Sequence, residues 1–339
     1  MTISILIPCY NEEKSIRKCV QSCLDQTRKL DQILVVNDGS TDKSLQILKS
    51  FKKKIEILNL HPATGNKSYA QEEGLKLIKG DIVVTTDGDT IIDKNFVNLI
   101  ENDFLDPQVT AVCGVVKSLK YNWLTAYRAF DYSISTNLHK LAQSHLGFIL
   151  VIPGAAGAFR TKIFKEFIGF DHDTLTEDLD FTYKLHKFGL KIKYDKDAIV
   201  YTQDPANLAS YINQMRRWFS GGWQNLKKHF NLDLFYHPGR SLELSLIYLE
   251  GLVFSIMLFL VPLINFVFAL KLLALYMVLV IVQAIYASVK EKRLDLLQVI
   301  VFYPIMMYIN AWVFLEQFIK EIILRKKNLV WFHAERVSI

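Results

Sequence analysis

The amino-acid sequence predicts an α/β fold, with a mostly parallel sheet flanked by helices, followed by an α-helical transmembrane region. Up to about residue 200, short runs of β-formers alternate with amphipathic stretches, and after Leu242 three long uncharged windows follow one another. Hydrophobic residues make up 51% of the chain, too many for an ordinary soluble domain, while 22% charged residues are too many for a wholly embedded protein. We therefore expect a domain over residues 1–235, about three membrane helices over 242–320, and a basic and aromatic tail over 321–339.

Six segments have the apolar, β-rich pattern of strands. They are Ile3–Pro8, Gln32–Asn37, Lys54–Leu60, Asp81–Thr86, Thr110–Val116 and Ile192–Tyr201. Between the first two, apolar residues recur at helical spacing from Ile16 to Leu24, and we expect Asn11 to be the N-cap of this helix. The loop Cys9–Asn11 then lies at the carboxyl end of a strand, which is the edge of an open α/β sheet where ligands bind.

The three uncharged windows, Gly251–Leu270, Leu272–Val289 and Leu296–Leu315, are each close to the ~20 residues that cross a bilayer. The first two are separated by Lys271 alone, so we expect helices over about Leu244–Val261 and Phe266–Val289 that turn near Pro262–Asn265. The charged segment Lys290-Glu291-Lys292-Arg293 favours the cytosolic side, which agrees with a cytosolic catalytic domain.

The third window leaves two alternatives open. Three full crossings would place Arg325-Lys326-Lys327 outside, against the tendency of basic residues to stay in the cytosol. Either that tendency fails here, or one of the three segments does not span the membrane.

Charge and cysteine content exclude other classes of protein. The net charge of +6 and the lack of a basic run with interleaved aromatics argue against a nucleic-acid partner. The four cysteines, Cys9, Cys19, Cys23 and Cys113, have no metal-binding spacing and are expected to be free thiols. The opening run Ile3–Pro8 lacks the features of a secretory signal and is expected to be a buried strand.

Acidic residues follow two of the predicted strands. Asp38 comes directly after an apolar strand and before Gly39, a position suited to binding a base or ribose but equally ordinary in a turn. Asp87 and Asp89 flank Gly88 at the end of another apolar strand. Because adjacent carboxylates repel one another unless a cation lies near them, and hard oxygen ligands suit Mg²⁺ or Mn²⁺, this pair predicts a metal and diphosphate site.

Two further clusters carry chemistry. Glu177 and Asp178 head a helical pattern that stops at Gly189; they suit acid–base chemistry, although the helix dipole also favours acids at this position. Gln214-Met215-Arg216-Arg217-Trp218 combines an arginine fork for phosphate with a flat indole for a sugar ring. The structural alternative for this segment is a basic and aromatic anchor near the lipid headgroups.

Taken in order, these segments resemble the processive family-2 glycosyltransferases, the group of cellulose, chitin, hyaluronan and bacterial poly-N-acetylglucosamine synthases. The resemblance covers about residues 1–230 and implies a GT-A fold. It is carried by Pro8-Cys9-Tyr10-Asn11-Glu12 with Asp38, by the helix from Lys67 to Gly74, and by three motifs, Asp87-Gly88-Asp89, Thr176-Glu177-Asp178 and Gln214 with Arg217 and Trp218. The first two of these three motifs, Asp87-Gly88-Asp89 and Thr176-Glu177-Asp178, are most similar to the poly-N-acetylglucosamine and chitooligosaccharide branch.

The resemblance assigns a role to each residue. It implies that Asp178 is the base that deprotonates the acceptor and that Asp89 binds Mg²⁺ or Mn²⁺. It implies that a UDP-sugar is bound by Pro8, Tyr10, Glu12, Asp38, Lys67, Asp87 and Arg217. It implies acceptor binding by Gly154, Glu177, Gln214 and Trp218, with Gly154–Arg160 as an acceptor-side loop whose small residues let the sugar approach the backbone.

Two departures from the family pattern modify these expectations. Asn37 stands where many relatives have a second acid, which affects the detail of nucleotide binding. The chain has only about three membrane helices, fewer than relatives that secrete their polymer, so we expect secretion to need a homo-oligomer or a partner protein.

The predicted function is therefore inverting transfer of GlcNAc or Glc from a UDP-sugar to a growing β-linked polysaccharide, by a multi-pass protein of the cell membrane. The alternative acceptor is a membrane lipid such as a polyisoprenyl phosphate or ceramide. A catalytically silent scaffold would be expected to have lost an acid from one of the motifs, and none is lost.

Overall fold

Eight strands form one sheet in the order β3-β2-β1-β4-β7-β6-β8-β5. The computed structural model describes residues 1–166, 168–236, 238–327 and 329. The strands are β1 Ile3–Cys9, β2 Gln32–Asp38, β3 Glu56–Leu60, β4 Ile82–Thr85, β5 Ile91–Ile92, β6 Val109–Ser118, β7 Gly157–Arg160 and β8 Lys191–Thr202. The strands β3, β2, β1 and β4 run parallel, β7 is antiparallel to both its neighbours, and β6 and β8 run parallel again. The expectation of a mostly parallel sheet is confirmed.

Twelve α-helices accompany the sheet in the described residues. They are α1 Ile16–Leu24, α2 Ser44–Ser50, α3 Lys67–Leu75, α4 Phe96–Asp103, α5 Trp123–Ile134, α6 Lys140–His145, α7 Lys162–Glu166, α8 Glu177–Lys187, α9 Leu208–Tyr236, α10 Pro238–Ile264, α11 Phe266–Glu291 and α12 Val299–Phe318. Short 3₁₀ turns lie at Lys52–Lys54 and Leu294–Gln298, and π-helical turns at Ser135–His139 and Ile319–Ile323.

All six predicted strands are present, and two strands were missed. The segment Gly154–Arg160 was expected to be a loop, but Gly157–Arg160 is β7, which lies between β4 and β6. Ala158 pairs with Val84 on one side and Val112 on the other. Of the small residues that suggested a loop, Gly157 and Ala158 are buried in the middle of the sheet, where a Cβ on Gly157 would come within 2.9 Å of the Phe159 ring.

The predicted N-cap of the first helix is also wrong. Ser15 precedes α1, whereas Asn11 lies further back in a left-handed turn with φ of 54°. Its side-chain oxygen accepts a hydrogen bond from the backbone N–H of Thr41 at 2.8 Å, and its own N–H donates to Ser40 Oγ at 3.0 Å. Asn11 therefore joins the loops that follow β1 and β2.

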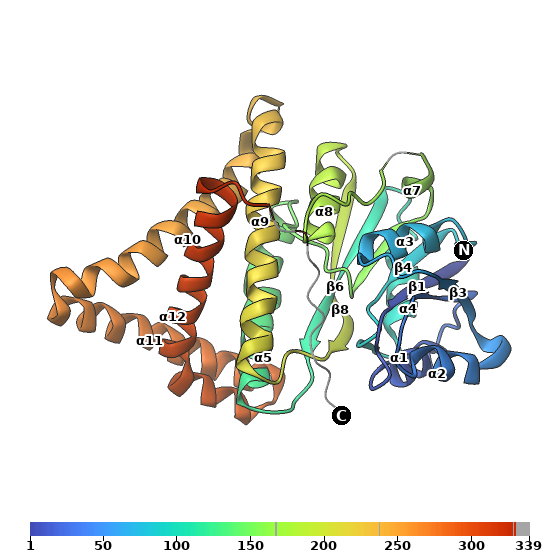
Figure 1. Cartoon of the computed structure of the whole chain (residues 1–339), viewed down its shortest axis with the longest axis horizontal. Coiled ribbons are helices and arrows are strands. Elements are labelled where there is room, and N and C mark those ends of the chain that lie inside the picture. Colours follow the sequence, from blue (N-terminus) through green and yellow to red (C-terminus); the bar gives the residue numbers. More distant parts are fainter. Residues whose placement is uncertain (167, 237, 328, 330–339) are drawn as a thin grey trace.

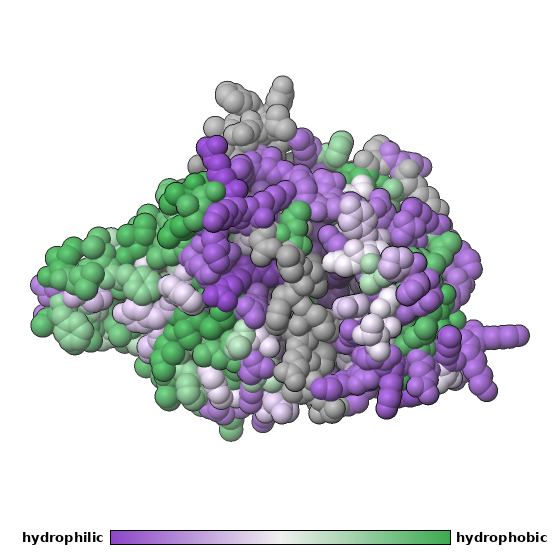
Figure 2. All heavy atoms as spheres, in the orientation of Figure 1, coloured by the Kyte–Doolittle hydropathy of each residue, from purple (hydrophilic) through white to green (hydrophobic). Residues whose placement is uncertain are grey.

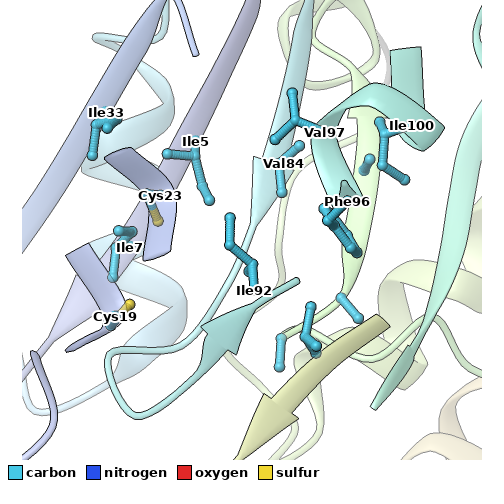
Figure 3. Close-up of a cluster of buried hydrophobic side chains, with 14 of the residues drawn as sticks. Ile5, Ile7, Cys19, Cys23, Ile33, Val84, Ile92, Phe96, Val97 and Ile100 are labelled. Carbon is cyan, nitrogen blue, oxygen red and sulfur yellow. The ribbon is translucent and has the colours of Figure 1, made fainter. Parts of the chain in front are cut away.

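The sheet has a buried core on each face, as expected for strands that are continuously apolar. On one face, α1 and α4 cover Ile5, Ile7 and Val84, with Cys19, Cys23, Phe96 and Ile100 packed between them (Figure 3). On the other face, α3 and α8 cover Leu6, Val36 and Val83. The two layers of helices hold the strands in place, so the loops at their carboxyl ends are fixed at one edge.

The C-terminal helices lie to one side of the sheet. The helices α10 and α11 form a hairpin that projects away from it, and α12 returns alongside α9 (Figure 1). The three apolar segments are each long and apolar enough to cross a membrane, at Ser245–Ile264, Phe266–Glu291 and Leu294–Ile323. Figure 2 shows the projecting hairpin as a mostly hydrophobic surface beside a mostly hydrophilic body.

Candidate active site

A cavity of about 640 Å³ opens at the carboxyl ends of β1, β2 and β4 and extends to α8 and α9. Every residue that the sequence predicted for the donor, metal, acceptor and proton transfer lines this cavity. These residues are Pro8, Tyr10, Glu12, Asp38, Lys67, Asp87, Asp89, Gly154, Glu177, Asp178, Gln214, Arg217 and Trp218. They come from segments more than 200 residues apart in the chain, so the fold alone brings them together.

Asp38 ends β2 and supports the loop in front of α3. The backbone N–H and the hydroxyl of Thr64 donate to its two carboxylate oxygens at 2.7 and 2.8 Å. A carboxylate oxygen has a second lone pair, so these bonds leave Asp38 able to accept further hydrogen bonds from the cavity. Glu12 is buried nearby and accepts a hydrogen bond from the Ser15 hydroxyl at 2.6 Å. Both acids thus have a structural role besides the one predicted.

Lys67 links the two acidic motifs. It is the first residue of α3, and its Nζ lies 2.6 Å from Asp87 Oδ1 and 3.3 Å from Glu177 Oε1. Burial by itself would lower the pKa of Lys67, but the Asp87 and Glu177 carboxylates outweigh it and hold the pKa above its ordinary value. Gly154 lies against this amine, since a Cβ on Gly154 would be 3.1 Å from Nζ. The lysine is therefore a fixed positive charge inside the cavity.

Asp89 is almost fully buried but faces the cavity. Its Oδ1 accepts hydrogen bonds from the hydroxyls of Thr90 at 3.2 Å and Thr202 at 3.5 Å. Thr202 is the last residue of β8, so this contact holds the carboxylate between two strand ends. Gly88, next to Asp89, has no side chain, and a Cβ there would come within 3.2 Å of the Glu12 side chain.

Asp178 lies in the first turn of α8, opposite Gly154. Its Oδ2 accepts a hydrogen bond from the Gly154 N–H at 3.3 Å, and its Oδ1 accepts one from the Leu179 N–H at 2.9 Å. Burial, together with the neighbouring Glu177 carboxylate, raises the pKa of Asp178 from its usual range to about 6. A base with a pKa near the working pH can take a proton and release it again, which suits proton transfer.

The loop just before Asp178 rests on α9. Asn225 donates to the carbonyl oxygen of Thr176 at 3.2 Å and to its hydroxyl at 2.9 Å. Gly221 is one turn earlier, and a Cβ there would lie 2.5 Å from Thr176 Oγ1. A glycine is required at this point because any side chain would displace the Thr176 loop.

Asp180 does not belong to the cavity. It is fully buried and accepts a hydrogen bond from His229 Nε2 at 2.8 Å, with Lys184 and Lys228 each at 3.0 Å. Burial alone would raise the pKa of Asp180, but these partners, His229 foremost, hold it well below the usual range. Asp180 therefore fastens α8 to α9, whereas Glu177 and Asp178 face the cavity.

The far wall of the cavity is built around Arg128, which is buried under Trp218. The Arg128 guanidinium lies 4.7 Å from the ring centres of Trp218 and Tyr132. Its Nε donates to Asp204 Oδ1 at 3.3 Å, and Tyr132 donates to the same oxygen at 3.3 Å. Asp204 and Tyr132 line the cavity beside Trp218, and Asp204 Oδ2 is buried without a hydrogen-bond partner. This wall combines an aromatic surface with a hydrogen-bond acceptor.

Comparison with known families identifies the chain. The sequence profile described as "Glycosyltransferase like family 2" matches residues 2–221. The chain belongs to this family. The predicted family and fold are thereby confirmed, and the expectation of an enzyme is confirmed at the level of this family.

The family-2 chain is similar to curated polysaccharide synthases. It is 31% identical over 232 residues to the poly-β-1,6-N-acetyl-D-glucosamine synthase of Staphylococcus epidermidis, and 29% identical over the same length to that of Staphylococcus aureus. Each match covers 67% of this chain and 56% of the relative. The chain therefore spans little more than half the length of the curated relatives it matches.

Two solved structures share the fold of the family-2 chain. The mannosyltransferase PcManGT from Pyrobaculum calidifontis, in complex with GDP-Man and Mn²⁺, has a TM-score of 0.61 at 17% identity, over 92% of this chain and 86% of that one. Residues 1–349 of S. aureus TarS, in complex with UDP-GlcNAc, have a TM-score of 0.50 at 17% identity, over 90% and 92% of the two chains. At these identities the likeness shows the fold alone.

The cavity of the family-2 chain offers donors of the type that a divalent metal needs. Among the described side chains, no three His, Cys, Asp or Glu residues come together as a metal site. Mg²⁺ usually keeps several waters and is bound through one or two carboxylates together with substrate phosphates, so a cage of three side chains is not required. Asp89, a carboxylate facing the cavity, fits that arrangement.

Arg128, Tyr132 and Asp204 are the residues of this site that the sequence analysis missed. Asp204 could have been found, because it follows the end of β8 just as Asp87 follows the end of β4. Arg128 gave no signal, since a single arginine on an amphipathic helix ordinarily points to solvent. Its burial depends on Asp204 and Trp218, which are more than 70 residues away in the chain.

Proposed function

We propose that this protein transfers GlcNAc or Glc from a UDP-sugar to the growing end of a β-linked polysaccharide, with inversion at the anomeric carbon. The observation that carries the proposal is the position of Asp178. This carboxylate, with a pKa of about 6, faces the same cavity as Asp89, Lys67 and Arg217. A base and the groups that would hold a diphosphate thus share one enclosed site.

The cavity residues divide the reaction between them. The donor nucleotide lies against the ends of β1 and β2, with Pro8, Tyr10, Glu12 and Asp38 around it, and Arg217 and Lys67 reach its diphosphate. Asp178 takes the proton of the acceptor hydroxyl while the hydroxyl oxygen bonds to the anomeric carbon. The bond from that carbon to the diphosphate breaks on the opposite face, UDP leaves, and the configuration inverts.

A divalent cation, Mg²⁺ or Mn²⁺, held by Asp89, would supply additional positive charge to the departing diphosphate. Asp87 lies next to this position, and its Oδ1 forms an ion pair with Lys67 Nζ at 2.6 Å. We propose that Lys67 partly offsets the negative charge of Asp87 and Glu177 until the donor enters. The developing negative charge of the diphosphate then meets the positive groups Lys67 and Arg217, which are already in place, as electrostatic stabilisation requires.

The acceptor side lies at Gly154, Glu177, Gln214 and Trp218. Gly154 has no side chain, so a sugar could approach its backbone, and Trp218 offers the flat surface on which sugar rings stack. The names of the curated relatives support GlcNAc as the donor sugar and a polysaccharide as the product. The whole chain would work at the cell membrane as a multi-pass protein with its catalytic domain in the cytosol.

A membrane lipid is the second candidate acceptor. It is favoured by the small number of apolar helices in the described chain, three, which would form a narrow path for a polymer. Export of a long product by this chain would then need a homo-oligomer or a secretion partner. A lipid acceptor such as a polyisoprenyl phosphate or ceramide would need neither, and would use the same base and the same donor site.

The test is to incubate the detergent-solubilised protein with Mn²⁺ or Mg²⁺ and single radiolabelled UDP-sugars, then to measure UDP release and size the product. Aqueous label that grows long with UDP-GlcNAc or UDP-Glc supports the polysaccharide proposal. A single sugar on a solvent-extractable lipid supports the second candidate. Absence of UDP release with every UDP-sugar would refute both.

A further inference from the structure

The three apolar helices have two different environments. Most of the surface of α10 and α11 is exposed: neighbouring pairs such as Val253 and Phe254, or Phe266 and Val267, are both exposed, and only 6% of each apolar window is buried. The end of α11 nearest the catalytic body packs on it through the buried Ala284 and Ala287. A helix that is apolar all round and exposed over most of its length belongs in hydrocarbon. The third apolar window is 33% buried, and this burial comes from contact with the catalytic body.

The segment that leads into α12 is fastened to the sheet domain. Lys117, in β6, forms an ion pair with Glu291 at 2.7 Å. Arg293 donates to the carbonyl oxygen of Ser118 at 3.0 Å. The charged stretch between the second and third apolar segments therefore lies on the same side of the membrane as the catalytic domain.

The body of α12 runs side by side with α9 and in the same direction. Asn310 accepts a hydrogen bond from the Tyr211 hydroxyl at 2.8 Å, and Glu316 pairs with Arg216 at 2.9 Å. From the first contact to the second, the residue number rises in both helices, so the two helices run in the same direction. The helix α12 thus follows α9, the helix that carries Arg217 and Trp218, as Figure 1 shows.

The end of this segment also returns to the catalytic body. Glu321 is buried and accepts hydrogen bonds from the Ser220 hydroxyl and from Gln224 Nε2, the latter at 2.8 Å. The Oε1 of Gln224 accepts a hydrogen bond from the N–H of Leu175 at 3.0 Å, in the loop just before Asp178. A helix whose beginning and end both touch the same domain does not cross a bilayer between them.

The outward face of α12 is an apolar stripe. The exposed residues recur every three or four positions, which places them on one face of the helix: Val301, Ile305, Tyr308 and Trp312. The opposite face carries the contacts to α5 and α9. The inward face is also largely apolar, with Met306 and Val313 buried, but it is covered by the catalytic body. Because that face is held by the catalytic body and the outward stripe is exposed, α12 suits the boundary of the hydrocarbon on the catalytic side.

We propose that α10 and α11 form the hairpin that crosses the bilayer, and that α12 lies along the membrane surface on the catalytic side. From Leu246 to the turn at Asn265, α10 spans roughly 29 Å at 1.5 Å per residue, close to the ~30 Å hydrocarbon thickness. The turn can face the far interface because the Asn265 side chain accepts a hydrogen bond from Phe268 N–H at 2.9 Å. Arg325, Lys326 and Lys327 then stay on the catalytic side, in agreement with the positive-inside tendency.

The proposal is tested by the accessibility of single introduced cysteines in intact and permeabilised cells that express the full chain. The four native cysteines are buried, at 2% exposure or less, so a membrane-impermeant maleimide should find little background. Lys53→Cys reports the catalytic domain, Ile264→Cys the hairpin turn and Lys327→Cys the end of the third segment; all three positions are exposed. Each variant is first shown to react in detergent.

We expect Lys53→Cys and Lys327→Cys to be labelled only after permeabilisation, and Ile264→Cys to be labelled in intact cells. Labelling of Lys327→Cys from outside would mean three crossings and would overturn the proposal. Protection of Ile264→Cys in intact cells would overturn the crossing hairpin, since the turn would then stay within the bilayer. The readout is independent of catalysis, so it stands whichever sugar and acceptor the enzyme uses. A fluorescent protein fused to the C-terminus, fluorescent only when cytosolic, provides a second measurement.

Discussion

Lys67 and Asp87 form an ion pair at 2.6 Å within the cavity, and Glu177 lies on the other side of the same amine at 3.3 Å. The donor-side motif and the acceptor-side motif are therefore joined through one positive charge. The lysine also lowers the pKa of Asp178, against burial and Glu177, which raise it. Lys67 thus influences both the phosphate site and the base.

Replacing Lys67 with Met should affect rate and pH dependence together. We expect kcat/KM to fall roughly 10- to 100-fold, the equivalent of one charged hydrogen bond of about 1.5–3 kcal/mol. The acidic limb of the pH–rate profile should move to higher pH, because Asp178 loses a charge that favoured its ionised form. Lys76→Met, on an exposed lysine that follows the same helix, is the control. An unchanged acidic limb would show that Lys67 does not act on the base.

Replacing Asp178 with Asn should remove general-base catalysis, which is typically worth about 10² to 10⁴ in rate. In the unchanged protein, activity should rise with pH through about 6 and then level off, because Asp178 works in its ionised form. UDP binding, measured by calorimetry, should stay the same in the variant. Asp173→Asn, on an exposed acid outside the cavity, is the control. An Asp178→Asn enzyme with most of its activity would mean that another group is the base.

The same substitution should stabilise the protein at alkaline pH. The folded-state pKa of Asp178, about 6, lies above the unfolded value, so the folded protein holds its proton more tightly. Stability is then lost as pH rises from about 4 to 6, and ionised Asp178 remains unfavourable above that range. Asp178→Asn should therefore have a higher Tm than the unchanged protein at pH 8 and lose this advantage at pH 4. Equal Tm differences at both pH values would contradict this account.

Replacing Asp204 with Asn should weaken acceptor binding and spare the donor. The substitution keeps the shape of the side chain but removes its negative charge, which lies 3.3 Å from Arg128 Nε. It also removes Oδ2 as a hydrogen-bond acceptor at the cavity wall. We expect the acceptor KM to rise about 10-fold or more, in line with the loss of one charged hydrogen bond, while the KM for the UDP-sugar is unchanged. Asp197→Asn, on the exposed part of the same strand, is the control. A rise in the KM for the UDP-sugar alone would mean that Asp204 contributes to donor binding, and would contradict this prediction.

Replacing Gly221 with Ala should disturb the Thr176 loop without disturbing α9 itself. Alanine favours a helix by about 1 kcal/mol over glycine, so any loss must come from the contact. The new Cβ would lie 2.5 Å from Thr176 Oγ1 and 2.9 Å from its backbone nitrogen. We expect kcat to fall while the Kd for UDP changes little. Gly169→Ala is the control, because no atom lies within 4 Å of a Cβ there. Equal kcat values in the two variants would show that the contact between Gly221 and Thr176 does not affect catalysis.

Much of the sheet and its ligand edge could be predicted because parallel strands leave a strong pattern. Each long buried strand is an apolar run, and the acids that follow Asn37 and Thr86 necessarily meet at one edge. The short strands β5 and β7 gave no such pattern. The helix-cap signal at Asn11 was misleading because asparagine also favours left-handed turns, which is the conformation it adopts.

The sequence left the place of the third apolar helix undecided because hydropathy measures composition, and both a crossing helix and a surface helix can be apolar. The residues that decide it, Glu316 and Glu321, stand just beyond the uncharged window and look like its polar end. Only their partners Arg216 and Ser220 show that they face the catalytic body. Arg128 is a similar case, since its burial depends on residues far away in the chain.

Because α12 packs along α9, the catalytic body is formed by two separate parts of the chain. The α10–α11 hairpin is inserted between these two parts. A truncation near residue 235, where hydropathy rises, would strip α12 away and leave its buried contacts with α5 and α9 open to water, among them those of Met306 and Val313. Excising the outer part of the hairpin, residues 253–279, and rejoining the ends would keep both pieces. A water-soluble form of this enzyme should therefore be sought by deletion from the middle of the chain rather than from its end.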